Sequence, residues 1–369
     1  MTQRERQLLR WIEEDPTISQ QELAERAGIT RSSVAVHISN LMKKGYIIGK
    51  GYIVRSAPYI AVIGAVSMDI TGRSHGALFE KNTNPGQVRT SIGGTGLHIA
   101  HALRLLGSDV QLITALGNDV AAQRLMDTCG ALGISLTHAL HIPGASTPTC
   151  LSIAEPDGSI RLAVSDTAIY EQLTPAFLSA HLPMLNHAQL ILIDTSLPEE
   201  SMDWLAKNCH VHLLAAPICA AQAHKLRCAL PALHALIADR TEIEQISGIP
   251  LSSRHNLERA ADVLLSNGVK RLYISLDENG LFIADRHERR ILPRSCAVSV
   301  NAAGSAEAFA AAIAWLHPQS MDLEYAARAG MAAAAITSES EEVISPALCA
   351  ALLHHRIAAG KANFTYPHN

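Results

Sequence analysis

The sequence predicts an α/β fold with a mainly parallel sheet over residues 57–369, preceded by a small, mostly helical unit over residues 1–56. Three observations lead to this prediction. Apolar residues recur at helical spacing in the first part, short apolar strands alternate with helical stretches in the second, and the net charge changes sign between the two. A chain of 369 residues, of which 48% are hydrophobic, is long enough for one large and one small domain.

The first 56 residues are expected to form three helices followed by a hairpin. Ser19 and Glu22 form a capping box at the start of the second helix, and Thr30 caps the third. The third helix buries one apolar face, and glycines mark the turn of the hairpin. The expected elements, in chain order, are helices over Arg4–Glu14, 20–27 and Arg31–Lys44 and a hairpin over Tyr46–Val54.

Three closely spaced helices followed by a basic two-stranded wing resemble a winged helix–turn–helix domain. In that class of domain the third helix enters the major groove of DNA. Outward side chains of this helix are candidates for contacts with base edges, namely Arg31, Ser32, Ser33, His37 and Asn40. Three lysines are better placed for phosphates, namely Lys43, Lys44 and Lys50. The alternative is a protein-interaction module. Because one copy reads a single half-site poorly, a DNA-binding role implies a dimer.

Charge and composition restrict the class of protein. Residues 1–56 hold nine Lys/Arg and six Asp/Glu, a net of +3, so the remainder carries −7 of the chain's total of −4. A basic segment on an acidic protein indicates a polyanion partner, with a solvated basic face as the alternative. The seven cysteines form no CxxC pair, which fits reduced thiols in the cytoplasm. The sequence shows neither a signal peptide nor an apolar run of membrane-spanning length.

From Tyr59 onward, short apolar strands alternate with helical stretches. The expected strands are Tyr59–Gly64, Val110–Thr114, Gln189–Asp194, Val211–Ala215, His234–Ala238 and Arg271–Leu276. Helices are expected between most of them, for example over Gly96–Leu106, Glu199–Asn208 and Arg254–Ser266. Strands that are apolar on both sides belong to a mainly parallel sheet with helices on both faces. Two segments break the alternation and are expected to form a small β lid, Ile70–Ile92 and Pro148–Val164.

Polar residues follow several of these strands, at the edge where open α/β sheets bind their ligands. Asp69 follows the first strand, and the run Gly93–Gly96 precedes a helix. Asp239 and Glu242 follow a later strand and stand three residues apart at a helix start. Their carboxylates are candidates for a water-coordinated Mg²⁺, and the alternative is that they only cap the helix.

Histidines are numerous, but their spacing does not predict a metal site. His210 and His212 are expected on one face of a strand, and His354 and His355 are adjacent. Neither pair is accompanied by a third and fourth ligand at a known spacing. We therefore do not expect a histidine metal centre from the sequence.

The segment Val300–Phe309 follows a strand-like run at Ala297–Val300 and opens an alanine-rich helix that is expected to reach about Leu316. A helix N-terminus presents unpaired N–H groups and partial positive charge, which together suit an anion. Glu307 places an acid in that first turn. The segment is therefore either a phosphate cradle beside a carboxylate base, or a helix capped by Asn301 whose acid merely suits the dipole.

The chain from Tyr59 to about Leu353 resembles the ribokinase-like, pfkB-type family of carbohydrate and nucleoside kinases. Asn84–Gly107 is similar to the first signature of that family, a Gly-Gly pair followed by a leucine-rich helix that ends in Leu-Gly. Further segments look most like the pseudouridine kinases, namely GAVSMDI at 64–70, NPG at 84–86, AVSD at 163–166 and SEEVISPAL at 340–348. In that group, a winged-helix domain ahead of the kinase domain is familiar.

The resemblance implies that a lid closes over a sugar or nucleoside, and that ATP with Mg²⁺ supplies the phosphoryl group. It places Glu307 at the position of the catalytic base. It places the backbone amides of Gly304, Ser305 and Ala306 at the anion hole that holds the phosphoryl charge. The implied substrate-binding residues are Asp69, Gly93, Gly94, His98 and Asp166.

The sequence departs from the family's second signature, Asp-Thr-x-Gly-Ala-Gly-Asp, and from other family positions. The departing residues are His98, Ile237, Asp277, Asn301, Ala302, Ala306 and Glu307. Ala306 adds a Cβ where the backbone must approach phosphate and where a glycine would allow a positive φ. The longer Glu307 displaces its carboxylate by about 1 Å. Asp277 replaces a glycine near the nucleotide phosphates. Together these changes remove positive charge, add negative charge and crowd the cradle.

Two functions remain open. The first is a ligand-responsive transcription regulator, in which a sugar- or nucleoside-binding domain with an eroded phosphotransfer site is joined to a DNA-binding domain. The second is an active carbohydrate or nucleoside kinase, of pseudouridine type, that carries its own DNA-binding domain and uses ATP and Mg²⁺. Both imply a sugar or nucleoside ligand, DNA as a partner and a cytoplasmic homodimer without membrane attachment.

Overall fold

The computed structural model describes residues 1–47, 58–293 and 300–362. The chain divides into two compact units, Met1–Pro58 and Tyr59–Asn369, which are described here one at a time. Lys50, most of the expected hairpin and most of the strand-like run at 297–300 lie outside the described residues. Within the described ranges, no helix combines the length and the apolar character that crossing a membrane requires.

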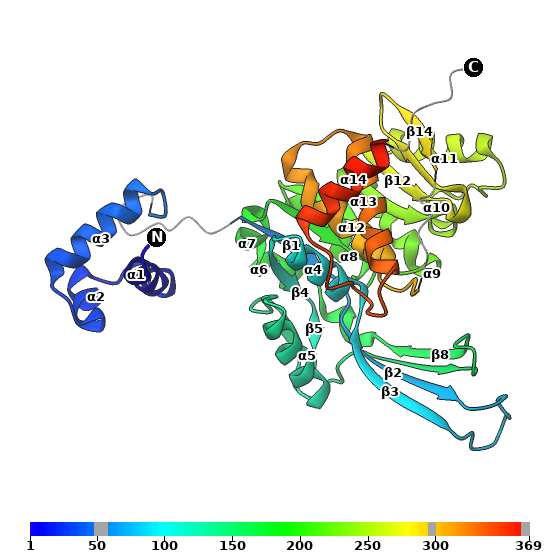
Figure 1. Cartoon of the computed structure of the whole chain (residues 1–369), viewed down its shortest axis with the longest axis horizontal. Helices are drawn as coiled ribbons and strands as arrows, with labels where there is room; N and C mark the ends of the chain where they lie inside the picture. The colour runs from blue at the N-terminus through cyan, green and yellow to red at the C-terminus, as the bar shows by residue number, and fades with distance from the viewer. Residues whose placement is uncertain (48–57, 294–299, 363–369) are drawn as a thin grey trace. The chain divides into compact units, whose positions relative to one another are not determined.

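The N-terminal unit consists of three helices around one apolar core (Figure 1). They are α1 (Gln3–Glu14), α2 (Gln20–Ala27) and α3 (Arg31–Lys43). The predicted caps are present: the Ser19 side chain accepts from the Glu22 amide in a reciprocal capping box, and the Thr30 side chain accepts from the Ser33 amide. Residues from all three helices form the core, among them Leu8, Ile12, Leu23, Val34, Ile38 and Leu41. The three-helix part of the prediction is thus confirmed.

The second unit is built on an eight-stranded sheet in the order β14-β13-β12-β11-β10-β9-β1-β4. The six strands from β12 to β4 are parallel to their neighbours, whereas β13 and β14 are antiparallel. Their bounds are β1 Tyr59–Ile63, β4 Asp109–Ile113, β9 Leu190–Ile193, β10 His212–Ala215, β11 Leu233–Asp239, β12 Arg271–Ser275, β13 Leu281–Ala284 and β14 Arg289–Leu292. All six strands expected from the sequence are present, within two residues of their predicted ends.

Side-chain alternation along β1 explains why helices cover both faces of the sheet. Ile60 and Val62 belong to one buried apolar cluster, while Ala61 and Ile63 belong to another on the opposite face. The first cluster includes residues of α4 (Thr95–Leu105), α5 (Val120–Ala131), α12 (Ser305–Leu316), α13 (Leu323–Ser338) and α14 (Ala350–Ala362). The second includes residues of α6 (Pro175–Ala180), α7 (Leu182–His187), α8 (Glu199–Asn208), α9 (Ala220–Ala223), α10 (Arg240–Ser247) and α11 (Arg254–Ser266).

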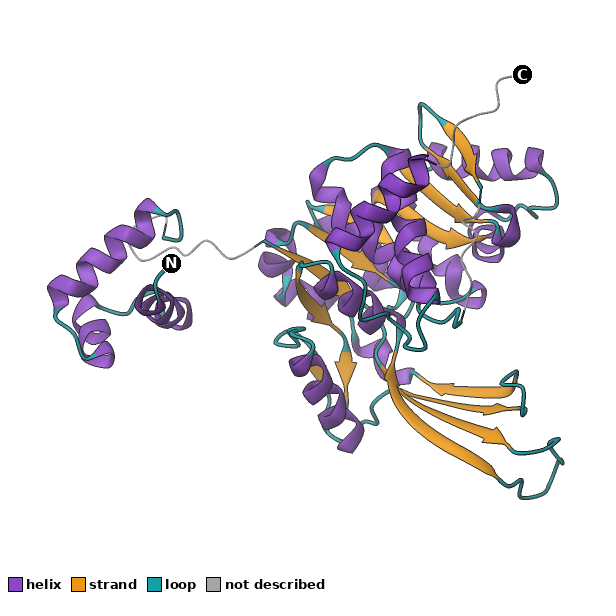
Figure 2. Cartoon of the chain, viewed as in Figure 1, coloured by secondary structure: helices purple, strands orange, loops and turns teal. Residues whose placement is uncertain are grey.

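The expected lid is a separate four-stranded sheet in the order β3-β2-β7-β8. Its strands are β2 (Ser67–Ser74), β3 (Gly86–Gly93), β7 (Thr149–Ala154) and β8 (Ile160–Asp166). Figure 2 shows these strands projecting from the rest of the α/β unit. Strands β5 (Ala115–Leu116) and β6 (Leu140–His141) are parallel and form a separate two-stranded sheet. Three predicted site residues lie at or near the ends of lid strands: Asp69 is the third residue of β2, Gly93 is the last of β3 and Asp166 is the last of β8.

Short 3₁₀ helices complete the connections: η1 Ala168–Gln172, η2 His224–Cys228, η3 Leu230–Ala232, η4 Asp277–Asn279 and η5 His317–Gln319. Two of them bear on function. The η4 turn follows β12 at the carboxyl edge of the sheet, where ligands of such folds bind. The η5 turn follows α12 directly, so it marks the far end of the helix whose N-terminus was predicted to hold phosphate.

The start of α12 excludes the alternative in which Asn301 caps this helix. Asn301 does not cap the helix; its side-chain oxygen accepts from the Ala303 amide at 3.0 Å and its side-chain nitrogen donates to the Glu341 carbonyl at 3.1 Å. The N-cap is Gly304, in a left-handed conformation with φ 77°. The Asn301 side chain therefore shapes the turn before the helix and ties it to the segment at residue 341.

Candidate functional site

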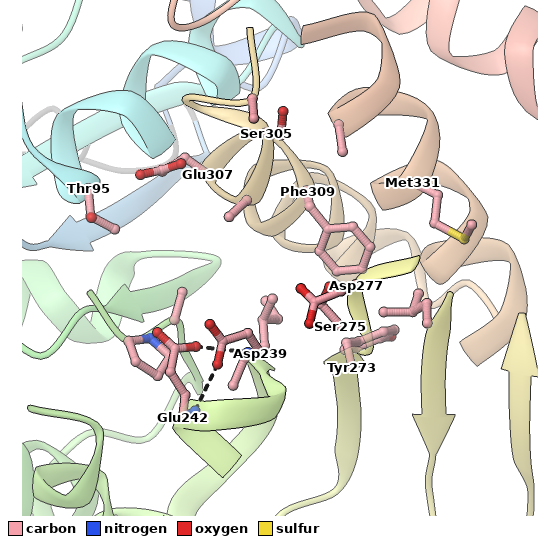
Figure 3. Close-up of a pocket in the computed structure, with 18 of the residues that line it drawn as sticks. Thr95, Asp239, Glu242, Tyr273, Ser275, Asp277, Ser305, Glu307, Phe309 and Met331 are labelled. Carbon is pink, nitrogen blue, oxygen red and sulfur yellow. Dashed lines mark hydrogen bonds between the residues drawn. The ribbon is translucent and has the colours of Figure 1, made fainter. Parts of the chain in front are cut away.

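A pocket of about 560 Å³ opens at the carboxyl edge of the main sheet, where β11 and β12 end and α12 begins. Figure 3 shows its residues converging from these elements. The apolar part of the wall comes mainly from Ile237, Tyr273, Leu281, Phe309 and Met331. The polar part comes from strand ends and helix starts, because backbone groups and short polar side chains gather there.

The N-terminus of α12 forms one side of this pocket. A Cβ added to Gly304 would lie 1.8 Å from the Val343 carbonyl oxygen, so only glycine fits at this N-cap. Ser305 and Ala306 follow and line the pocket. The Ser305 hydroxyl is buried and has no hydrogen-bond partner within the described residues. These residues occupy the positions predicted for an anion hole, and free N–H groups of a first helical turn support that chemistry.

Ala306 does not carry the strain that the sequence suggested. Among the described non-glycine residues, positive φ angles occur only at Lys81, Asp277 and Ser320. Ala306 is the second residue of α12 and has ordinary helical geometry. The expectation of a positive φ at this position was therefore wrong, because the turn places its left-handed residue at Gly304, two residues earlier.

Glu307 lies at the boundary between this pocket and the substrate-side residues. Figure 3 shows its carboxylate directed toward Thr95, at the start of α4. Its Oε1 lies 4.0 Å from Nδ1 of His98. Burial raises the pKa of Glu307. Hydrogen bonds with its own backbone amide and with the Thr95 side chain offset part of that rise. A carboxylate with a raised pKa is a stronger proton acceptor than an ordinary exposed one, which suits a general base.

Asp69 and His98 form the substrate-side group next to Glu307. Ser67 donates a hydrogen bond to Asp69 at 2.7 Å. A Cβ on Gly93 would lie 2.1 Å from an Asp69 carboxylate oxygen, so the glycine makes room for that carboxylate. Burial raises the pKa of Asp69 and lowers the pKa of His98, and each partly offsets the shift of the other. The structure thus brings together three predicted site residues that are up to 238 positions apart in the sequence.

Gly94, the second glycine of the pair, is needed for the conformation of the backbone. Gly94 has φ 105°, and a Cβ there would lie 2.5 Å from the Ala65 carbonyl oxygen. Gly94 is the N-cap of α4, the helix that carries His98. The pair therefore lets the chain pass from the lid strand β3 into α4 against the end of β1.

Asp166 is less closely connected with the other substrate-side residues. It is the last residue of β8 and pairs with Thr149 of β7, which in turn pairs with Met68 of β2. Two strand spacings, about 10 Å, separate its backbone from that of β2. Its side chain is exposed on the lid. Asp166 would contact a ligand only if the lid itself forms part of the ligand-binding site.

Asp239 and Glu242 form a reciprocal capping box at the start of α10, as one alternative from the sequence proposed. The Asp239 carboxylate accepts from the Glu242 amide at 2.7 Å, and the Glu242 carboxylate accepts from the Asp239 amide at 2.8 Å (Figure 3). Both residues also line the pocket. Burial, followed by the nearby charges of Asp239 and Glu307, raises the pKa of Glu242 to about 7. Carboxylate oxygens suit Mg²⁺, so the magnesium hypothesis stays compatible with the cap.

Asp277 adds a further carboxylate to the pocket wall. It begins the η4 turn with φ 54°, a left-handed conformation that a glycine adopts without strain. The pocket is therefore lined by four carboxylates, Asp239, Glu242, Asp277 and Glu307. None of the lining residues in the described part of the chain is lysine or arginine. This balance is unfavourable for a polyphosphate.

Asp194 was not singled out in the sequence, where it appeared only as a strand end. It is fully buried and accepts hydrogen bonds from the amides of Ala65 and Ser196 and from the Ser196 hydroxyl. Burial raises the pKa of Asp194 despite these bonds. A Cβ on Gly64 would lie 2.4 Å from its carboxylate. Asp194 thereby holds the loop after β1 that leads to Asp69.

The predicted DNA-contact residues lie along α3. Arg31, Ser32 and Lys43 are exposed, whereas Ser33, His37 and Asn40 are half-buried. Ser32 and Ser33 hydroxyls lie 2.9 Å from Thr30 Oγ1, within the cap. The Lys44 ammonium donates to both carboxylate oxygens of Glu5, at 2.9 and 2.7 Å. Lys44 thus fastens α1 to the end of α3, a contact that the sequence did not suggest.

Comparison with known proteins agrees with this architecture. Residues 57–348 match the model of the pfkB family carbohydrate kinases, and residues 1–48 match a winged helix–turn–helix DNA-binding model. The fold and site define a ribokinase-like α/β domain behind an N-terminal helix–turn–helix domain. The chain belongs to the pfkB family of carbohydrate kinases.

Individual relatives match long stretches of this chain. The chain is 31% identical to the uncharacterized sugar kinase YeiI of Escherichia coli K12 over 352 residues, 95% of this chain and 97% of that protein. It is 31% identical to the pseudouridine kinase of the same organism over 232 residues, 63% of this chain and 74% of that protein. A carbohydrate kinase structure from Agrobacterium tumefaciens superposes with a TM-score of 0.72 at 24% identity, over 82% of this chain and 97% of that one.

Proposed function

We propose that this protein is a ligand-responsive DNA-binding regulator whose pfkB-type domain binds a sugar or nucleoside but transfers phosphate weakly or not at all. One observation carries the proposal: four carboxylates line the pocket at the α12 N-terminus, and its described lining residues include no lysine or arginine. A cytoplasmic homodimer is the form that fits recognition of two DNA half-sites.

The charge balance of the pocket opposes a nucleotide. At an effective dielectric constant of about 20, two unit charges about 8 Å apart interact by about 2 kcal/mol. Burial raises the pKa of Glu242 to about 7, so this carboxylate carries less than its full charge near pH 7. Burial also raises the pKa of Glu307. Asp239 and Asp277 add to the repulsion. Asp239 and Glu242 could hold Mg²⁺ through water, and that ion would offset part of it.

The substrate-side group supports ligand binding without phosphotransfer. Asp69 and His98 are partly buried polar side chains at the base of the lid, and both can bond sugar hydroxyls. A ligand that binds with lid closure can shift the population of one conformation of the domain. Coupling of that shift to DNA binding is the regulatory step that we propose.

The test uses the full-length protein with ATP–Mg and a panel of sugars and nucleosides, pseudouridine first. We expect turnover well below about 1 s⁻¹, a low value for a kinase. In parallel, retention of a palindromic DNA fragment is measured with and without each nucleoside, and one nucleoside should change it. Asp69→Asn should abolish that response and leave DNA binding intact, while the exposed lid-turn variant Asp157→Asn serves as the matched control. Turnover above about 1 s⁻¹ would overturn the proposal.

A working sugar or nucleoside kinase is the second candidate, because Glu307 keeps an acid beside the substrate-side group and the α12 N-terminus keeps the geometry of an anion site. In that case ATP and Mg²⁺ are the cofactors, and pseudouridine is the first substrate to test. Glu307→Gln should then lower kcat by about 10²-fold or more, since it removes the proton acceptor. Equal turnover by the variant and the wild type would exclude this assignment of the base.

A further inference from the structure

Three histidines converge at the edge of the main sheet opposite the pocket. His212 is the first residue of β10 and His234 is the second residue of the parallel neighbour β11. His317 follows α12 at the start of η5. The pocket lies beyond the carboxyl ends of β10 and β11, so this cluster, at their amino ends, is a separate feature of the same unit.

The three imidazoles lie close enough to share one ligand. One ring nitrogen from each histidine lies within 4.8 Å of the corresponding atoms of the other two. Nδ1 of His212 and Nε2 of His317 are 2.6 Å apart. The ring centroid of His234 lies 4.1 Å from that of His212 and 4.4 Å from that of His317. In a tetrahedral zinc site, bonds of about 2.1 Å place ligand nitrogens about 3.4 Å apart, so small side-chain rotations suffice.

The cluster is accessible to an ion from solvent. His212 is exposed, and the other two are half-buried. Burial, and then the neighbouring histidines, lower the pKa of His234 to about 4 and that of His317 to about 3. Neutral imidazole is the ligand form of histidine.

Two cationic side chains act on the cluster. Arg271 adds to the lowering of the pKa values of both His234 and His317, and Lys270 adds to that of His234. The Arg271 guanidinium donates to the Met321 carbonyl at 3.0 Å, in the segment between η5 and α13. These cations weaken the binding of any metal ion, so only an ion with strong affinity for imidazole would occupy the site.

We propose that His212, His234 and His317 bind one divalent transition-metal ion of the zinc class, with solvent in the remaining coordination position. An all-imidazole donor set favours Zn²⁺, Co²⁺, Ni²⁺ or Cu²⁺ over Mg²⁺, which prefers oxygen. The site is therefore chemically distinct from the carboxylate pair Asp239 and Glu242 in the pocket.

The bound ion would fasten the end of α12 to the sheet. The helix has 12 residues and begins beside the pocket at Gly304, so about 18 Å of regular helix separates the two sites. An ion that binds only the folded protein stabilises it by mass action. We expect metal binding to raise the melting temperature of the full-length protein without requiring ATP, sugar or DNA.

The test is a titration of chelator-treated full-length protein with ZnCl₂ by calorimetry and by thermal shift. One equivalent should bind and Tm should rise, whereas MgCl₂ at the same concentration should not compete. Co²⁺ should give the visible absorption of a low-coordinate nitrogen site, without the near-ultraviolet band of thiolate ligands. His212→Gln and His317→Gln should each weaken binding by tenfold or more, and the neighbouring exposed His210→Gln should leave it unchanged.

Two variants keep the test decisive, because His212 is exposed and its substitution leaves the core intact. Unchanged affinity in both His212→Gln and His317→Gln would overturn the proposal. So would a thiolate band with Co²⁺, or the absence of binding below about 100 μM Zn²⁺, which would leave the His212–His317 contact as a hydrogen bond alone. Binding lost in Glu242→Gln and retained in His212→Gln would place the ion in the pocket instead and would equally contradict the assignment.

Discussion

At the scale of single residues, Asp277 changes the pocket in two ways. It adds a carboxylate to the wall, and it holds the left-handed conformation in which the family pattern has glycine. The sequence comparison identified the substitution, but the φ of 54° shows that the backbone retains the shape that a glycine would give. The charge, rather than the shape, is therefore the relevant departure.

Asp277→Asn should strengthen the binding of ATP–Mg to the full-length protein. Asparagine tolerates the left-handed conformation, so the turn should persist while one negative charge is removed. Removing one charge near the phosphates should gain about 1 kcal/mol, or about fivefold in Kd. Calorimetry or a fluorescent ATP analogue measures the change. Asp285→Asn, at the turn between β13 and β14, is the control, and equal affinity in both variants would contradict the electrostatic argument.

Glu242 should make stability depend on pH. Its pKa is about 7 in the folded protein and near 4.5 when unfolded, so between these values the folded state holds a proton that the unfolded state has lost. The contribution of this group to stability therefore falls as pH rises from about 4.5 to about 7. Glu242→Gln keeps the capping geometry and should be more stable than the wild type at pH 8, by up to about 3 kcal/mol.

The measurement is urea unfolding across pH 4.5–8 in the presence of chelator. The difference between Glu242→Gln and the wild type should shrink toward pH 4.5, where both side chains are neutral. Glu200→Gln, an exposed position in the first turn of α8, should follow the wild type at every pH. A difference that stays constant over this range would show that Glu242 does not titrate as its burial implies.

At the scale of elements, the turn before α12 places the first residues of this helix at the wall of the pocket. Gly304 is confined by its φ of 77° and by the Val343 carbonyl, and the residues after it face the pocket. The sequence predicted the helix and its end near Leu316, because alanine-rich helical patterns are local signals. It did not identify the N-cap, because the choice between Asn301 and Gly304 depends on the segment at 341–343, which packs against the turn.

Gly304→Ala should destabilise the protein by about 3 kcal/mol or more. Part of the loss is the strain of a left-handed alanine, about 1–2 kcal/mol, and the rest comes from the displacement of Val343. Gly248→Ala provides the matched control, because Gly248 has φ 73° but nothing within 4 Å of an added Cβ. Urea unfolding, followed by tryptophan fluorescence, compares the two. Equal losses would show that the contact with Val343 relaxes freely.

At the scale of the whole molecule, the chain joins a basic helix–turn–helix unit to an acidic pfkB domain. The proposed regulatory function needs both, since in that proposal the first unit binds DNA and the second binds the ligand. Lys44, predicted to contact phosphate, donates to the Glu5 carboxylate within its own unit. The neighbouring Lys43 is exposed, so it is the better residue with which to test the predicted phosphate contact.

Lys43→Ala should weaken DNA binding by the full-length protein about equally for all sequences. The loss of one phosphate contact should reduce the slope of log K against log salt by about 1. Fluorescence anisotropy at several salt concentrations measures the slope. Lys207→Ala, in the other unit, removes the same charge from the surface of α8 and should leave the slope unchanged. A similar change in both variants would mean that only net charge matters.

The sequence by itself determined the three N-terminal helices, six strands of the main sheet, the lid segments, and the helix caps at Ser19 and Thr30. These features depend on alternation, capping and turn chemistry within a few residues of the chain. The tertiary structure decided which distant side chains meet: the pairing of Lys44 with Glu5, the four carboxylates of one pocket, and the convergence of His212, His234 and His317. No local pattern encodes such meetings, because they follow from how parallel strands and crossing helices pack.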